Sequence, residues 1–119
     1  MAVKLFDSEL KVMEVLWKEG DQTAKQISDI LRDSIGWNVN TTYTVIKKCI
    51  AKGAVVRSEP NFMCHALISK ETVQEEETSA LIDKLFEGSS DLLFASLLGR
   101  KRMTPEQIER LRQMAANME

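Results

Sequence analysis

The hydrophobic period of this chain changes abruptly at Gly53, and that change limits the folds the chain can adopt. Before Gly53, apolar residues recur every three to four positions, which is typical of amphipathic helices. After it, residues 54–58 and 62–68 have the composition of two short strands, joined by a turn at residues 59–61. Helical composition returns at residue 71. The order predicts a mainly α chain that contains one small α+β unit.

Start signals along the chain predict three helices before the hairpin. Asp7 or Ser8 is placed to cap the first helix and Thr23 the second, because short polar side chains accept hydrogen bonds from free backbone N–H groups. Asn38 or Asn40 is placed to cap the third. Three helices followed by a two-stranded hairpin are the order of elements in a winged helix, a variant of the helix-turn-helix.

The chain therefore divides into two predicted domains. Residues 1–70 are predicted to form a winged-helix DNA-binding domain of the α+β type, with a two-stranded wing. Residues 71–119 are helical again, and their clearest helix start is the sequence Thr104, Pro105 and, closing a capping box, Gln107. This second part is predicted to form a helical dimerisation domain.

The two faces of the third predicted helix differ in chemistry. At about 100° per residue its apolar side chains gather on one side, while the other side carries short polar residues first and lysines further along. A helix in a major groove needs this arrangement, with base-edge contacts from its first turns and phosphate contacts from lysines. A plain solvated face is the alternative, although such faces usually mix both signs of charge. The candidate DNA-binding residues are Asn40, Thr41, Tyr43, Thr44, Lys47 and Lys48 on this helix, with Arg57 and Asn61 on the hairpin.

The distribution of charge supports a DNA contact although the whole chain has a formal net charge of −2. Residues 34–58 contain no Asp or Glu, and their basic residues are Lys47, Lys48, Lys52 and Arg57. Attraction to DNA is set by charges within a Debye length, about 10 Å at 0.1 M salt, so a local basic patch can act on an acidic protein. The net negative charge leaves one alternative open, a winged-helix protein–protein interaction module without sequence-specific DNA binding.

The helices expected after residue 71 are more apolar than they can bury among themselves. Exposed apolar patches of this kind usually mark a partner, and a second copy of the chain is the economical one because two-fold dimers are the commonest oligomers. Packing back onto the first domain is the alternative. The candidate dimer-interface residues are Leu81, Leu85, Leu92, Leu93, Phe94, Leu97, Leu98, Ile108 and Leu111.

The sequence does not indicate catalysis, a cofactor or a metal. It has one histidine and no phosphate-binding glycine pattern, and no nucleophile is combined with a base and an orienting group. Met63, Cys64 and His65 are soft-metal ligand types, but neighbours on a strand point to opposite faces. A redox role for Cys64 stays open and requires an exposed thiol of low pKa. With no long apolar run and no visible signal peptide, a cytoplasmic protein without membrane contact is expected.

Three strings in the chain carry a family resemblance. They are E-L-K-V-M-E-V-L-W at residues 9–17, T-T-Y-T-V-I-K-K followed by A-K-G within residues 41–53, and T-P-E-Q-I-E-R-L at residues 104–111. These strings resemble the BlaI/MecI/CopY family, bacterial repressors of β-lactam-resistance and copper-homeostasis genes. The resemblance implies a winged-helix N-terminal domain, a helical C-terminal dimerisation domain and binding to an inverted repeat in a promoter. Residues and resemblance together predict a sequence-specific transcriptional repressor that acts as a homodimer on palindromic double-stranded DNA.

The chain departs from both regulatory branches of that family. In the resistance branch a protease cleaves the C-terminal domain at an Asn-Phe bond, and the matching positions here are Ser96 and Leu97. In the copper branch the C-terminal tail carries paired C-x-C ligands, whereas residues 71–119 contain no cysteine. The resemblance therefore identifies neither the inducing signal nor a regulatory protease or sensor.

Overall fold

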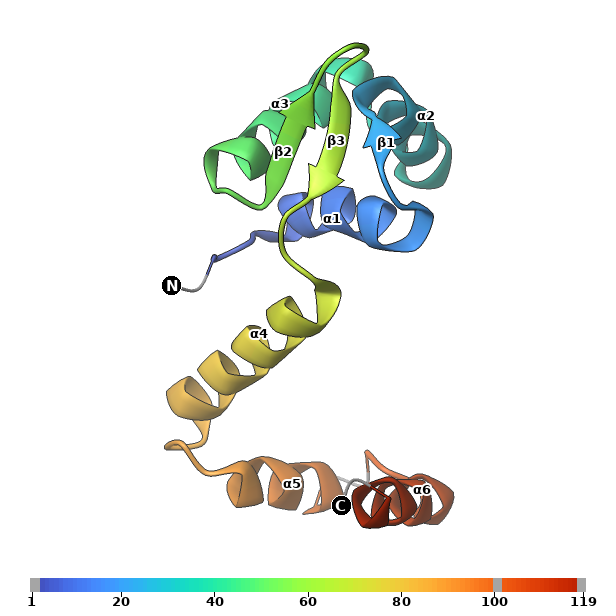
Figure 1. The fold of residues 1–119 in the computed structure, drawn as a ribbon. Coiled ribbons are helices and arrows are strands. Elements are labelled where there is room, and N and C mark those ends of the chain that lie inside the picture. The colour runs from blue at the N-terminus through green and yellow to red at the C-terminus, as the bar shows by residue number, and fades with distance from the viewer. Residues whose placement is uncertain (1–2, 100–101, 118–119) are drawn as a thin grey trace. The chain divides into compact units, whose positions relative to one another are not determined.

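The chain forms two compact units, Met1–Glu76 and Glu77–Glu119. The computed structural model describes residues 3–99 and 102–117 (Figure 1). The first unit contains α1 (Asp7–Glu19), β1 (Gln22–Thr23), α2 (Ala24–Ile35), α3 (Val39–Ala51), β2 (Val55–Ser58), β3 (Met63–Ala66) and the start of α4 (Lys70–Leu85). The second contains the rest of α4, then α5 (Ser90–Gly99) and α6 (Pro105–Ala116).

The first unit packs three helices and a sheet around one core. Met13, Ile27 and Ile46, one from each of the first three helices, are fully buried, and Val55 and Cys64 cover them from the sheet. Each large apolar side chain buried in this way contributes roughly 1.5–3 kcal/mol to folding. Three helices and a hairpin therefore share their hydrophobic faces, as the predicted winged helix requires.

The sheet has three antiparallel strands in the order β1-β3-β2. The predicted hairpin wing is present as β2 and β3, in which Val55 pairs with Ala66. The sequence did not indicate the third strand, β1, in which Gln22 pairs with Cys64. Two residues are too few to show an alternating pattern in the sequence, so this strand is identified only by its pairing with β3 in the structure.

Helix caps confirm two of the predicted helix starts and correct a third. The Thr23 hydroxyl accepts from the Gln26 N–H at 3.1 Å at the start of α2, and the Asn38 side chain accepts from the Thr41 N–H at 2.8 Å at the start of α3. Neither Asp7 nor Ser8 caps α1. Its N-cap is Phe6, which has no polar side chain.

A partly buried ion pair joins α1 to the end of α3. Glu9 is only 1% exposed, and its carboxylate lies 2.5 Å from the Lys52 ammonium group while accepting from the Phe6 N–H at 2.8 Å. Lys52 also donates to the Lys4 carbonyl at 2.7 Å and lies 4.0 Å from the centre of the Phe6 ring. One carboxylate therefore starts α1 and holds the C-terminal end of α3 against it.

The environment of Glu9 keeps its carboxyl group ionised. Burial alone would raise the pKa of Glu9, but the hydrogen bonds from Lys52 and from the Phe6 N–H, with the positive charges of Lys52 and Lys48, together lower that pKa below its usual value. The pair therefore stabilises the fold above the unfolded pKa of about 4.5, and this contribution is lost as the pH falls through the lowered folded-state value.

The second unit has clear helix boundaries but no buried core. The Thr104 hydroxyl accepts from the Gln107 N–H at 3.1 Å and completes the capping box predicted for α6. Glu87 and Gly88, which follow α4, both have positive φ angles, 54° and 77°. In the described ranges 77–99 and 102–117, no side chain is buried. No helix within the described parts of the chain is long and apolar enough to cross a membrane.

Lys52→Met should destabilise the first unit and reverse the contribution that Glu9 makes to the pH dependence of its unfolding free energy. It leaves Glu9 buried without its cation, at a cost of about 2–4 kcal/mol in unfolding free energy at neutral pH. Burial then raises the pKa of Glu9, so the loss should shrink as the pH falls from about 7 to about 4. Chemical denaturation across this pH range measures the difference from the wild-type protein.

Lys11→Met, an exposed lysine on α1, is the matched control and should change unfolding free energy little at any pH. A loss for Lys52→Met that stays constant over the whole pH range would show that the carboxylate of Glu9 does not depend on Lys52.

Candidate nucleic-acid interface

Helix α3 has one face in the core and one face open to solvent. Its buried residues are Thr42, Val45, Ile46 and Cys49, the side that the helical projection assigned to the core. Its exposed residues include Asn40, Thr41, Thr44, Lys47 and Lys48, and Tyr43 is half-buried at the edge. The six candidate DNA-binding residues on this helix are therefore accessible, five of them exposed and one half-buried.

The turn between α2 and α3 gives the arrangement of a helix-turn-helix. Gly36 ends α2 with a φ of 76°, and its N–H donates to the Arg32 carbonyl at 3.0 Å. Residues other than glycine rarely adopt this left-handed backbone conformation, which reverses the chain within a few residues. Trp37 then packs against the core before Asn38 starts α3. The turn thus sets α3 across α2 with its polar face outward.

The lysines of the basic patch have different roles. Lys47 and Lys48 are exposed and form no ion pair with any residue that the structure describes. Lys52, by contrast, is held by Glu9 and by the Lys4 carbonyl. Arg57, the fourth basic residue of the predicted patch, is also paired with a carboxylate, that of Glu59. Two of the four charges are therefore engaged, and those of Lys47 and Lys48 remain on the exposed face of α3.

The hairpin places Arg57 and Asn61 differently. Asn61 is exposed at the turn between β2 and β3, with a φ of 70°. The Arg57 side chain lies over the Phe62 ring, 3.7 Å from its centre, and its Nε–H donates to the Glu59 carboxylate. Arg57 is therefore partly engaged within the hairpin itself.

A hydrogen-bonded chain crosses the sheet beside this site. Nδ1 of His65 lies 2.8 Å from the Asp21 carboxylate, and its Nε2 lies 2.7 Å from the Ser58 hydroxyl. Asp21 precedes β1, His65 is in β3 and Ser58 ends β2. The chain therefore ties the three strands together through side chains, a connection that sequence reasoning missed because its members lie far apart in the chain.

Neither cysteine has the properties of a reactive thiol. Both are fully buried; burial raises the pKa of Cys49 to about 12 and that of Cys64 to about 11. The redox role left open for Cys64 needs an exposed thiol of low pKa, so the structure argues against it. Over the described parts of the chain, no group of three or more His, Cys, Asp or Glu could hold a metal ion.

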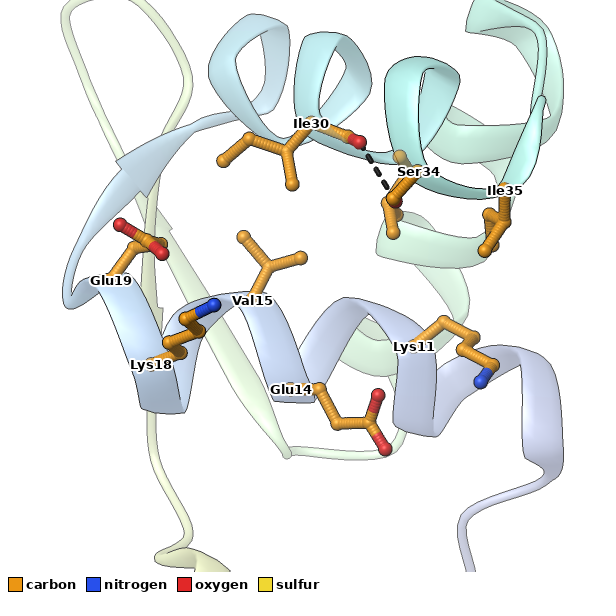
Figure 2. Close-up of a pocket in the computed structure, with 9 residues that line it drawn as sticks. Lys11, Glu14, Val15, Lys18, Glu19, Ile30, Ser34 and Ile35 are labelled. Carbon is orange, nitrogen blue, oxygen red and sulfur yellow. Dashed lines mark hydrogen bonds between the residues drawn. The ribbon is translucent and has the colours of Figure 1, made fainter.

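A shallow pocket of about 290 Å³ lies between α1 and α2. Figure 2 shows Val15 and Ile30 pointing toward each other across it, and the Ser34 hydroxyl donating to the Ile30 carbonyl at 2.8 Å. Lys18 and Glu14 lie on its rim. Because this rim carries both signs of charge, it does not extend the basic face of α3.

The second unit brings four of the candidate dimer residues around one apolar groove of about 500 Å³. Phe94 and Leu98 of α5 line it together with Ile108 and Leu111 of α6. The rest of the lining consists of Met103, Arg112, Met114 and Ala115, which were not among the candidates. Among the other candidates, Leu81, Leu85 and Leu92 are exposed, while Leu93 and Leu97 are half-buried.

Comparison with known proteins relates most of the chain to repressors. The family model described as penicillinase repressor matches residues 5–117. The methicillin resistance regulatory protein MecI of Mammaliicoccus sciuri is 22% identical over 111 residues, or 92% of this chain and 90% of that protein; MecI of Staphylococcus aureus strain N315 gives the same values. A solution structure of the DNA-binding domain of the repressor BlaI matches with a TM-score of 0.55 and 24% identity, covering 60% of this chain and 90% of that one. That match shows a shared fold.

Proposed function

Since this chain belongs to the penicillinase repressor family, we propose that it represses transcription as a homodimer bound to an inverted-repeat operator. The family membership confirms the resemblance drawn from the sequence and makes the protein a DNA-binding repressor rather than an enzyme. It favours DNA binding over the alternative, a winged-helix protein–protein interaction module without sequence-specific DNA binding. The operator and the dimer are the parts that we propose.

The exposed face of α3 is the observation that carries the proposed sequence recognition. Asn40, Thr41 and Thr44 lie in its first turns, where short polar side chains can reach base edges in a major groove. Lys47 and Lys48 follow, where they can neutralise phosphates. The face carries no acid to repel DNA, although the chain as a whole is acidic.

The proposed wing contacts come from Arg57 and Asn61 on the hairpin. Both are exposed, and the Phe62 ring connects this hairpin to α3 through an edge-to-face contact with Tyr43 at 5.7 Å. A guanidinium group and an amide are suited to phosphate oxygens and to the minor groove. We therefore include both residues, with Tyr43, in the proposed DNA-binding surface.

The proposed dimer rests on apolar side chains that the single chain leaves uncovered. In the second unit, eight large apolar side chains are between 40% and 62% exposed: Leu81, Leu85, Leu92, Phe94, Leu98, Ile108, Leu111 and Met114. Apolar surface of this extent marks an interface in most proteins. A second copy with the same surface would cover it, and a two-fold dimer would present two α3 helices to one face of DNA.

Lys47→Ala should weaken binding to mixed-sequence duplex DNA and reduce its salt dependence. If the lysine neutralises one phosphate, the slope of log K against log salt concentration should fall by about 0.9. Fluorescence anisotropy titrations at several salt concentrations measure both quantities. Lys18→Ala, an exposed lysine on α1, is the matched control and should leave the slope unchanged. An unaltered slope for Lys47→Ala would remove this residue from the proposed contacts.

Leu98→Asp should weaken dimerisation strongly while leaving each chain folded. Leu98 is 50% exposed in the single chain, so the carboxylate stays hydrated there but would be buried in the dimer. A loss of about 3 kcal/mol corresponds to a dissociation constant roughly 150-fold higher. Sedimentation velocity measures the dimer fraction, and Gln113→Asp, an exposed residue of α6 outside the groove lining, is the control. A dimer that persists in Leu98→Asp would place the interface elsewhere.

A further inference from the structure

The Phe62 ring lies between the exposed helix of the proposed site and its wing. Tyr43 of α3 meets it edge to face, with ring centres 5.7 Å apart, and Arg57 of β2 lies 3.7 Å from the ring centre. An aromatic pair and a cation–π contact each favour a specific geometry and stabilise it beyond the burial of apolar area. Phe62 thus contacts two candidate DNA-binding residues at once, Tyr43 on α3 and Arg57 on the hairpin.

The backbone of Phe62 is held in a conformation that a bulky residue rarely adopts. Its φ is 55°, in the left-handed region, directly after Asn61 at 70°. Such a residue persists only where its surroundings hold it. Here the Phe62 carbonyl accepts from the Ala24 N–H at 3.0 Å, which ties the hairpin to the start of α2. The position of the ring is therefore determined from α2, from α3 and from β2.

Arg57 is oriented by this ring and occupied by an internal anion. Its guanidinium carbon lies 3.7 Å from the centre of the Phe62 ring, while the Nε–H donates to the Glu59 carboxylate. Glu59 is exposed, and the hydrogen bond from Arg57 lowers the pKa of its carboxyl group. A guanidinium group binds carboxylates and phosphates through the same donors. The Glu59 carboxylate therefore occupies one of the five guanidinium N–H donors that a DNA phosphate could use.

We propose that Phe62 is a positioning residue that presents Arg57 to a DNA phosphate, and that Glu59 is a built-in competitor that occupies Arg57 in the free protein. This inference rests on the proposed function, since it concerns the same DNA-binding surface. The competitor lowers affinity for every DNA sequence alike, because its carboxylate partly neutralises the guanidinium group and competes with a phosphate for it. It therefore discourages non-specific binding, for which phosphate contacts supply nearly all of the attraction.

A double-mutant cycle separates competition from simple repulsion. Glu59→Gln should tighten binding to mixed-sequence duplex DNA about 3- to 10-fold, because a neutral amide releases Arg57. In an Arg57→Gln background the same change should have an effect below about 2-fold, since no guanidinium group remains to be released. An equal gain in both backgrounds would mean that Glu59 repels DNA by its charge alone. No gain in the wild-type background would also overturn the proposal.

Substitutions of Phe62 test the positioning role. Phe62→Tyr keeps a ring under Arg57 and should keep the wild-type affinity, whereas Phe62→Leu keeps apolar volume without a ring. Phe62→Leu should bind DNA several-fold more weakly and should lose the gain from Glu59→Gln. Thermal unfolding of each variant reports the structural effect separately. Wild-type affinity and an undiminished Glu59→Gln gain in Phe62→Leu would show that the ring does not position Arg57. If Phe62→Leu does not fold, the double-mutant cycle between Glu59 and Arg57 still tests whether Glu59 competes with DNA for Arg57.

The same titrations distinguish failure of the proposed DNA-binding function from failure of the Glu59 competitor. Wild-type protein that does not bind duplex DNA would overturn the proposed function. Wild-type protein that binds through Lys47, with no difference between the two Glu59→Gln backgrounds, would overturn only the competitor.

Discussion

The pair between Glu9 and Lys52 is the constraint on which the rest of the first unit depends. A carboxylate that is 1% exposed needs a partner, and its partner is 43 residues away at the end of α3. The same carboxylate accepts from the Phe6 N–H and so starts α1. The pair fixes α3 against α1 at this end, and the burial of Val45, Ile46 and Cys49 in the core leaves the polar side of α3 outside. One interaction thus links folding to the orientation of the proposed DNA-reading face.

The wing is coupled to that face by contacts at the other end of the unit. Tyr43 and Arg57 meet on the Phe62 ring, and the Phe62 carbonyl holds the start of α2. Helix α3 is therefore fixed near its C-terminus by an ion pair and near its N-terminal half by an aromatic contact. A helix held at both ends suits a protein that distinguishes DNA sequences, since base contacts require defined side-chain positions. The family membership of the chain agrees with this use.

Local features of the fold followed from the sequence, and long-range ones did not. The capping box at Thr23 and the apolar stripe of α3 are encoded by neighbouring residues, and both are present as predicted. The prediction for the start of α1 is wrong because the N-cap, Phe6, has no polar side chain. The carboxylate of Glu9 instead accepts a hydrogen bond from the Phe6 N–H. Lys52 was counted in the basic patch because its acidic partner lies far away in the sequence. The candidate residues on α3 are accessible as predicted, but the engagement of Arg57 depends on how the hairpin turns.

Selection of bound duplexes from a random DNA pool by the wild-type protein tests the proposed repressor most directly. A homodimer that presents two copies of α3 should enrich an inverted repeat, with half-sites about one helical turn, or roughly 10 base pairs, apart. A pool without any enriched sequence, together with weak binding that disappears by about 0.2 M salt, would leave only non-specific attraction and would contradict the account.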